Sequence, residues 1–535
     1  MHDVEIYISL VAIIIIVGIL FTKSPIPSAL LLVITGMVVS VIPGIPHIKL
    51  RPDIVLDLFL PLLIYQTCVL SSWRDFKKDF RAITLLSVGH VLFITLLVAV
   101  CAHQIIPELS WPMSFVLGAV ISPPDDIAII AIAEKIRMPQ RIVTILKGEG
   151  IFNDATALIL FRFSLAAVIT HQFFLGKAFL AFALIVIGES LYGFILGNVI
   201  AKLRTKLNDP ILHMLISVLT PFLAYLPAER LGGSGVLATV VTGLVVEHHY
   251  SRYLPEVRLL TSAVWKTLGF TIESILFLLV GLNLHYIYQR ITTIPIHQLV
   301  YYSVSIILIV IVGRFIWVFP ASYLPRYFFP SIRKRDPYPP WQYPFITAWA
   351  GMRGGISLAA ALAIPILPTI NGVASERDLL VFLVFMVIIA TLLVQGLALP
   401  WLLDVLGINS FGAKELHTEY LEELSARLIM TNEVIRWLNE YQDKKPSAAL
   451  DEEIKFRIAD YKNLKKRLTD RIKKNSTYIN IIPDDITESI ALSRQILDIE
   501  RNTLLNLWKA DKINHSIRNK LQEELDHRSN QFVSI

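Results

Sequence analysis

Long apolar stretches separated by short polar loops dominate the chain. The stretches Ile6–Leu20, Leu85–Val100 and Leu379–Pro400 contain no Asp, Glu, Lys or Arg. In helical conformation, about twenty apolar residues cross a hydrocarbon core about 30 Å thick. Because helices satisfy their own backbone hydrogen bonds in lipid, the pattern predicts an all-α polytopic membrane protein.

The apolar pattern predicts about 13 transmembrane spans. They are expected near residues 5–21, 26–43, 53–71, 82–103, 111–133, 142–170, 176–200, 209–227, 234–247, 259–287, 297–323, 342–365 and 378–404. After residue 410 the apolar runs stop. Two domains are therefore predicted, a transmembrane domain over residues 1–410 and a charged, helical tail over residues 411–535.

Loops rich in Lys and Arg alternate along the chain with loops that contain few of these residues. The rich loops carry Lys23; Arg74, Lys77, Lys78 and Arg81; Lys135, Arg137 and Arg141; Lys202, Arg204 and Lys206; Arg252 and Arg258; and Arg326, Arg333, Lys334 and Arg335. Basic loops stay in the cytoplasm, so the N-terminus is predicted outside and the tail inside. The short outer loops favour the cell membrane of a bacterium, the inner membrane, as the location.

Composition agrees with a membrane class, with 54% hydrophobic and 17% charged residues and a mean hydropathy of +0.60. The net charge of +6 is explained by the basic loops, so nucleic-acid binding is not expected. Cys68 and Cys101 both lie in apolar spans and lack metal-ligand spacing. Neither a disulfide framework nor a zinc site is predicted.

Ionisable residues inside the spans are the candidates for chemistry, because each costs on the order of 2.5–3.5 kcal/mol to insert. The densest groups are Ser122–Asp126 in the fifth span and Gly148–Asp154 in the sixth. Pro123 and Pro124 remove backbone donors, so a helix break is expected just before Asp125. Carbonyls left without helical donors, together with the carboxylates of Asp125 and Asp154, suit a small hard cation.

The twelfth span contains a second expected break, Gly351–Gly355, which includes Arg353. Spans five and twelve cross in opposite directions, because the twelfth span comes seven spans after the fifth and each further span reverses the direction. Two discontinuous helices in this relation indicate inverted repeats with a site between them, as in alternating-access transporters. Arg353 and Arg314 are buried cations that need partners, and we predict a structural Glu149–Arg353 ion pair that leaves the titration to Asp154.

Four segments in this order resemble the monovalent cation:proton antiporter family, in particular its NhaP-like sodium/proton exchangers. They are Ser122–Asp125, Lys147–Leu158, Phe277–Leu282 and Trp349–Gly354, and the resemblance extends over residues 5–405. It implies a homodimer with a six-helix core domain that moves as an elevator. It also implies that Asp154 binds cation and proton in turn, supported by Asn153 and Asp125, in electroneutral exchange that serves pH homeostasis.

Three positions depart from the family pattern. Gln66 stands where the family often has Glu, Gly150 where it often has Ser, and Pro124 where it often has Thr. Gln66 and Pro124 are therefore only possible contributors to the ion site. Asp126 is a further contributor that could compensate for the missing ligands or alter the stoichiometry.

The predicted function is secondary active exchange of a monovalent cation, sodium first, for protons. No cofactor is expected, and the only metal is the transported cation at Asp154 and Asp125. Exchange of potassium or another cation is the alternative, and a cation channel or an organic-solute transporter fits less well. An intramembrane hydrolase that uses Asp125 and Asp154 as a dyad lacks a protease-type motif, so the chain is not expected to be an enzyme.

Overall fold

The computed structural model describes residues 2–20, 28–42, 52–71, 73–125, 130, 138–170, 175–207, 209–291, 294–365, 376–443, 448–476, 499–500, 502–504, 506, 521 and 525. In this part of the chain the regular elements are all helices. Contacts divide the protein into two units, Met1–Gly412 and Ala413–Ile535.

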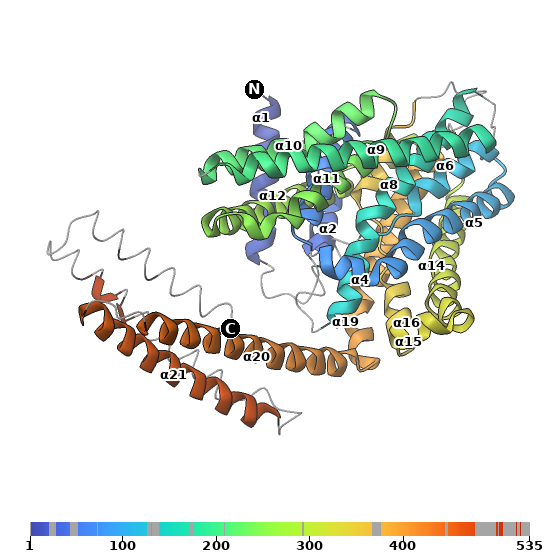
Figure 1. Ribbon diagram of the computed structural model, residues 1–535. Coiled ribbons are helices and arrows are strands. Elements are labelled where there is room, and N and C mark those ends of the chain that lie inside the picture. The colour runs from blue at the N-terminus through green and yellow to red at the C-terminus, as the bar shows by residue number, and fades with distance from the viewer. Residues whose placement is uncertain are drawn as a thin grey trace. The chain divides into compact units, whose positions relative to one another are not determined.

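The first unit contains nearly all of the helices (Figure 1). They are α1 (His2–Leu20), α2 (Ser28–Val41), η1 (Ile54–Phe59), α3 (Leu60–Val69), α4 (Trp73–Thr84), η2 (Leu85–Gly89), α5 (His90–Ile105), α6 (Trp111–Ile121), α8 (Gln140–Thr170), α9 (Leu175–Thr205), α10 (Pro210–Arg230), α11 (Val236–His248), η3 (Tyr250–Arg252), α12 (Pro255–Leu282), α13 (Leu284–Arg290), α14 (Ile296–Phe328), α15 (Pro330–Arg335), α16 (Gln342–Trp349), α17 (Gly355–Leu362), α18 (Glu376–Ala390), η4 (Thr391–Gln395) and α19 (Gly396–Val405).

Every predicted span overlaps helix within the described residues. Seven helices there are long and apolar enough to cross a membrane, and shorter apolar helices supplement them. The fourth span differs from the prediction, because helix already begins at Trp73 rather than near residue 82. The polar, basic sequence of α4 extends this helix beyond its apolar part, which hydropathy cannot detect.

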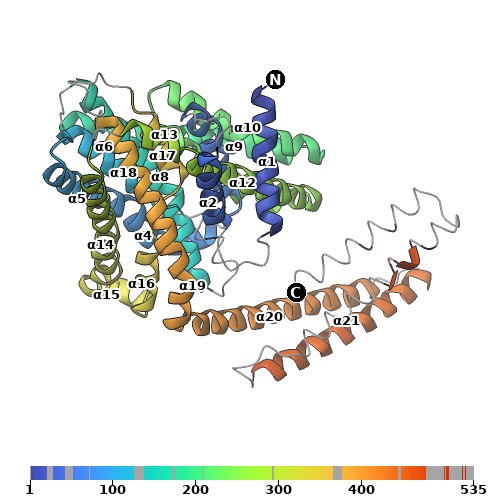
Figure 2. The same ribbon diagram turned by 180° about the vertical axis from the view of Figure 1, so that it is seen from behind.

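The bundle is held together by close helix crossings at glycine. α2 packs on α12, and a Cβ atom at Gly281 would lie 2.2 Å from the Val33 carbonyl oxygen and 2.9 Å from the Gly36 Cα. Small residues allow such contact between backbones. The two views place α1, α2 and α12 toward one end of the bundle and α5 and α14 toward the other, with α8 between them (Figures 1 and 2).

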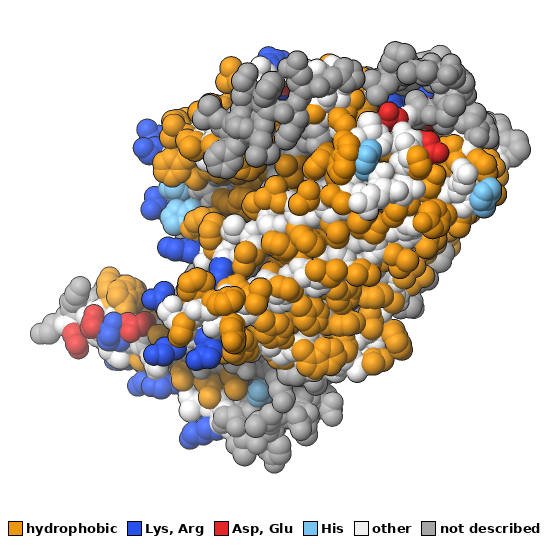
Figure 3. All heavy atoms as spheres, turned by 90° about the vertical axis from the view of Figure 1, so that its right-hand side faces the viewer, with side chains coloured by type: hydrophobic (Ala, Val, Ile, Leu, Met, Phe, Trp, Pro, Cys, Tyr) orange, Lys and Arg blue, Asp and Glu red, His pale blue; other side chains and the backbone are white. Residues whose placement is uncertain are grey.

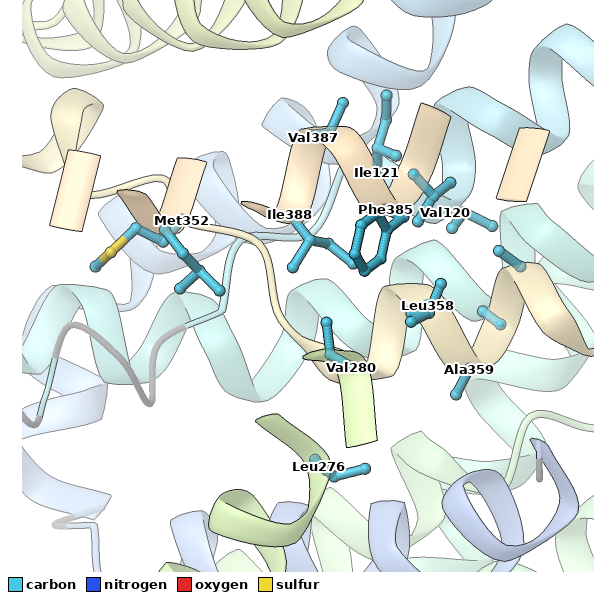
Figure 4. Packing of buried hydrophobic residues seen from close by; sticks show 14 of the residues in the cluster. Val120, Ile121, Leu276, Val280, Met352, Leu358, Ala359, Phe385, Val387 and Ile388 are labelled. Atoms are coloured by element: carbon cyan, nitrogen blue, oxygen red, sulfur yellow. The ribbon is translucent and has the colours of Figure 1, made fainter. Parts of the chain in front are cut away.

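The predicted interruptions coincide with the ends of helices. α6 ends at Ile121, and Ser122–Asp125 are not helical. Between α16 and α17, residues 350–354 are also not helical. Buried side chains of α6, α17 and α18 meet near these ends, including Ile121, Leu358 and Phe385 (Figure 4). The inverted-repeat relation between the two breaks stays a prediction.

Large hydrophobic side chains face outward along many helices. Examples are Ile19, Ile187, Leu215, Leu259 and Ile316, which are more than half exposed. Figure 3 shows a continuous hydrophobic surface over the middle of one face. Such a surface would be unfavourable in water and is typical of a protein that crosses a bilayer.

The second unit contains most of α20 (Ile408–Gln442) and all of α21 (Ala448–Ser476). Leu438 of α20 packs with Ile454 and Ile458 of α21. The side chain of Gln442 also donates a hydrogen bond to Asp451 at 2.9 Å. These contacts pack α20 against α21.

Candidate functional site

A cavity of about 40 Å³ lies where α3, the end of α6, α8, α12 and the start of α17 come together. Three acidic side chains line it, Asp125, Asp154 and Glu273. Thr67 and Ser357 add hydroxyl groups to a lining that is otherwise mostly apolar. A cavity of this volume has room for a small cation with a little water, since one water needs about 10–15 Å³.

Asp154 also borders a second, smaller cavity of about 20 Å³. Its lining includes Phe161, two turns further along α8, whereas the first cavity includes Gly150 and Ile151 on the preceding turn. Ser357 lines both spaces as well. Asp154 therefore lines two neighbouring cavities, one that includes residues of the preceding turn of α8 and one that includes residues of the following turns.

Backbone and amide hydrogen bonds fix the chain around Asp125. Asn153 Nδ2 donates to the Pro124 carbonyl at 2.8 Å, which ties the end of α6 to α8. The Asp125 backbone N–H donates to the Met352 carbonyl at 2.7 Å, which ties it to the break between α16 and α17. The carbonyl oxygen of Pro124 thus accepts a hydrogen bond from Asn153.

Gly354 allows the Asp125 carboxylate to approach the break. A Cβ atom at residue 354 would lie 2.0 Å from Asp125 Oδ2 and 2.5 Å from its Cγ. Even alanine would displace the carboxylate. The glycine in the Trp349–Gly354 motif is therefore required by a close contact with the site.

Arg353 lies fully buried at the same break and binds the end of α6. Its Nε donates to the Ile121 carbonyl at 2.6 Å, and its Nη1 donates to the Gly351 carbonyl. The last carbonyls of a helix lack intrahelical donors, so a buried helix end needs such a partner. Thr391 of η4 accepts from the Arg353 backbone N–H at 3.1 Å.

The predicted Glu149–Arg353 ion pair is wrong. Glu149 pairs with Arg314 of α14 through two hydrogen bonds of 2.7 and 2.9 Å. Arg314 also donates to the carbonyls of Thr347 and Ala350, at the end of α16. Each arginine binds the end of one interrupted helix, Arg353 that of α6 and Arg314 that of α16. Span order cannot reveal which cation reaches Glu149.

The remaining candidate residues do not all lie at the cavity. Gln66 packs against Gly269 of α12, where a Cβ would lie 1.8 Å from its Oε1, and it is not among the residues that line the cavity. Asp126 lies outside the described residues. Glu273, Thr67 and Ser357 were missed as site residues. The signal for Glu273 was its acidic side chain inside an apolar span.

No group of three His, Cys, Asp or Glu side chains able to hold a resident metal occurs among the described residues. The site instead offers three carboxylates and the hydroxyl groups of Thr67 and Ser357 around a small space. Oxygen donors of this kind suit a hard cation bound transiently.

The family described as sodium/hydrogen exchanger, transmembrane, matches residues 9–405. A sodium, potassium, lithium and rubidium/H(+) antiporter of Bacillus pumilus is 30% identical over 70% of this chain and 58% of its own length. The chain thus spans less than two thirds of that relative. The Na(+)/H(+) antiporter ApNhaP of Aphanothece halophytica is 29% identical over 94% of this chain and 91% of its own.

A solved structure of the sodium proton antiporter MjNhaP1 from Methanocaldococcus jannaschii resembles this fold. Its TM-score is 0.58 at 16% identity, and the match covers 75% of this chain and 98% of that chain. At this identity the likeness concerns the fold alone.

Proposed function

Because the chain belongs to the sodium/hydrogen exchanger family, we propose that this multi-pass membrane protein exchanges a monovalent cation for protons by alternating access. Sodium is the first candidate among the cations. The observation that carries the proposal is the position of Asp154, which borders both cavities. A carboxylate reached from either side in turn can accept a ligand on one side and release it on the other.

Competition at one carboxylate couples the two fluxes. A proton and a cation each neutralise the same buried charge, so Asp154 holds one or the other but not both. Neither ligand can leave the charged carboxylate behind in the low-dielectric interior without cost. Return of the empty, charged site is therefore unfavourable, and exchange is favoured over leak.

Asp125 and Asn153 support the site from the end of α6 and from α8. Asn153 donates to the Pro124 carbonyl, so this neutral side chain anchors the α6 end and adds no charge. Asp125 lines the same cavity as Asp154 and brings a second carboxylate to it. With Asp154 as the group that alternates, one cation moves for one proton and the exchange is electroneutral.

The buried charges of Glu149, Arg314 and Arg353 hold helices in place around the site. Glu149 and Arg314, each 1% exposed, join α8 to α14 and to the end of α16. Arg353 holds the end of α6 against the break in the twelfth span. They keep the interrupted helices aligned while Asp154 changes its ligand.

We further propose that the protein is a homodimer in a cell membrane, with the N-terminus outside and the tail in the cytoplasm. This orientation rests on the alternation of basic loops. In this setting the exchange contributes to pH homeostasis.

The test is transport in inside-out membrane vesicles with a respiration-generated proton gradient. Sodium, potassium or lithium is added, and collapse of the gradient is followed by a pH-sensitive dye. The intact protein should collapse the gradient with at least one cation, and Asp154→Asn should not, at equal expression. Activity retained by Asp154→Asn would overturn the assignment.

A channel is separated from an exchanger by clamping the membrane potential. Electroneutral exchange continues at its normal rate when potassium and valinomycin set the potential to zero. A channel would instead carry cation current without proton movement. That result would exclude the proposed exchange.

A further inference from the structure

Away from the ion site, Arg81 of α4, Arg141 of α8 and Arg326 of α14 converge on one carboxylate. They donate to Asp336 at 2.5, 2.8 and 2.6 Å, respectively. Arg141 also donates to Asp79 at 3.1 and 3.0 Å. The three guanidinium groups thus share two carboxylates, which leaves an excess of positive charge in this arginine cluster.

The hydrogen bonds of the cluster are incomplete. Arg81 Nη1 is buried and has no hydrogen-bond partner among the described residues. The Arg326 side chain is only 6% exposed, whereas those of Arg81 and Arg141 are 30% and 34% exposed, so the cluster is partly buried and still reachable from outside. A guanidinium needs acceptors for five N–H groups, and a buried donor without an acceptor is destabilising. An additional acceptor would complete the cluster.

A cavity of about 50 Å³ opens beside the three arginines. All three line it, and the rest of its wall includes the apolar side chains of Leu85, Ile145 and Ala321. The space is thus lined by guanidinium groups and by apolar side chains. Guanidinium groups bind phosphate oxygens in pairs, so these arginines suit a phosphate group.

The surroundings of the cavity have the composition of a membrane interface. Tyr327, Phe328 and Trp341 are 72%, 64% and 53% exposed near the ends of α14 and α16. Trp and Tyr concentrate at the level of lipid headgroups. Arg326 belongs to a basic loop that the positive-inside rule assigns to the cytoplasm. Basic pockets between transmembrane helices on that side are suited to anionic headgroups.

We propose that the arginine cluster binds the phosphate of an anionic phospholipid from the cytoplasmic leaflet. The phosphate accepts hydrogen bonds from Arg81 and its neighbours, and an acyl chain lies along Leu85, Ile145 and Ala321. Free phosphate shares the anion chemistry but would leave the apolar wall without a ligand. The bound lipid would connect α4, α8 and α14 and so stabilise this end of the bundle.

Binding can be measured without transport, so the proposal stands apart from the exchange function. The full chain, purified in neutral detergent, is titrated with dioctanoyl phosphatidylglycerol, dioctanoyl phosphatidylcholine or inorganic phosphate. Native mass spectrometry counts the bound ligand, and the midpoint of thermal unfolding reports its effect. Phosphatidylglycerol should bind about tenfold more tightly than either other ligand and alone should raise the midpoint.

Variants localise the binding. Arg81→Gln should weaken phosphatidylglycerol binding about tenfold, and Arg81→Lys, which keeps the charge but loses the planar fork, should weaken it less. Arg252→Gln is the matched control, because Arg252 is an exposed arginine in another basic loop. It removes the same charge and should leave the binding unchanged.

Three outcomes would overturn the proposal. Equal binding of phosphatidylcholine would show that the site does not select an anion. Equal binding of inorganic phosphate would make it a site for the free ion rather than for lipid. Unchanged phosphatidylglycerol binding by Arg81→Lys and Arg81→Gln would place the lipid elsewhere. The ranking of ligands on the unaltered protein decides the first two even if Arg81→Gln folds poorly.

Discussion

The carboxylate of Glu149 and the guanidinium of Arg314 form a two-pronged ion pair, with both side chains 1% exposed. Removal of one partner from a buried pair leaves an uncompensated charge and costs about 3–5 kcal/mol. Glu149→Gln and Arg314→Gln should each lower the thermal stability of the purified protein strongly. The double variant should lose less than the sum of the two, as a double-mutant cycle measures.

Arg290→Gln is the control for this pair, since Arg290 and Asp378 form a more exposed pair at 3.4 Å. Exposed pairs contribute about 0–1 kcal/mol, so little change is expected. If Glu149→Gln were fully stable and yet inactive in transport, Glu149 would belong to the ion site and not to the framework.

Gly354→Ala should abolish exchange because its Cβ would collide with the Asp125 carboxylate. The measurement is dye-monitored cation-induced collapse of the proton gradient in vesicles. Gly188→Ala is the control, because nothing lies within 4 Å of a Cβ there and alanine favours helix. Normal transport by Gly354→Ala would show that the Asp125 position does not matter.

Asn153→Ala should loosen the position of Pro124 and Asp125 at the end of α6 without removing a charge. It deletes the hydrogen bond to the Pro124 carbonyl, whose net value is about 0.5–1.5 kcal/mol. We expect the cation concentration for half-maximal exchange to rise about threefold to tenfold. Asn198→Ala removes an exposed amide that donates to its own helix, at Phe194, and should have no such effect. An unchanged concentration dependence in Asn153→Ala would remove the supporting role of Asn153.

The stability that Asp336 contributes should depend on pH. Burial tends to raise the pKa of Asp336, but hydrogen bonds and positive charge from Arg141 and Arg326 outweigh it and lower the pKa below its usual value. A carboxylate with a lowered folded-state pKa stabilises the protein above its unfolded-state pKa. This stabilisation is lost as the pH falls through the folded-state pKa.

Asp336→Asn should therefore lower the free energy of unfolding at pH 7 by on the order of 1–3 kcal/mol, because charged donors lose their acceptor. The midpoint of thermal unfolding should fall with it. The difference from the unaltered protein should shrink as the pH falls below about 4, the unfolded-state pKa, and should vanish once the pH lies below the lowered folded-state pKa, where Asp336 is protonated in both states. Thermal unfolding from acid to neutral pH measures it. Asp451→Asn, in the exposed Asp451–Lys455 pair, should show a much smaller difference at any pH. A gap for Asp336→Asn that is independent of pH would contradict this account.

Some of the residues that line the cavity could be predicted from the sequence and others could not. Asp125 and Asp154 were predicted as site residues because ionisable residues inside spans are costly and Pro123 and Pro124 mark a break. Asn153 was predicted only from the resemblance to the family. The structure brings Asp125 and Asp154 to one cavity. Glu273 and Ser357 line the same cavity. Glu273 carried the signal of an acidic side chain inside an apolar span, whereas nothing around Ser357 distinguishes it from a packing residue. Gln66 was a candidate only by comparison with a family pattern, and it packs against Gly269 instead.

The sequence by itself determined that the chain is a helical membrane protein and where its apolar helices lie, and it predicted breaks in spans five and twelve. These features depend on local composition, through the lengths of apolar runs and the backbone limits of Pro and Gly. Only the tertiary structure decided that Arg314, and not Arg353, binds Glu149, and that three distant arginines share Asp336. Such pairings depend on how helices rotate and cross in three dimensions, which spacing along the chain does not specify.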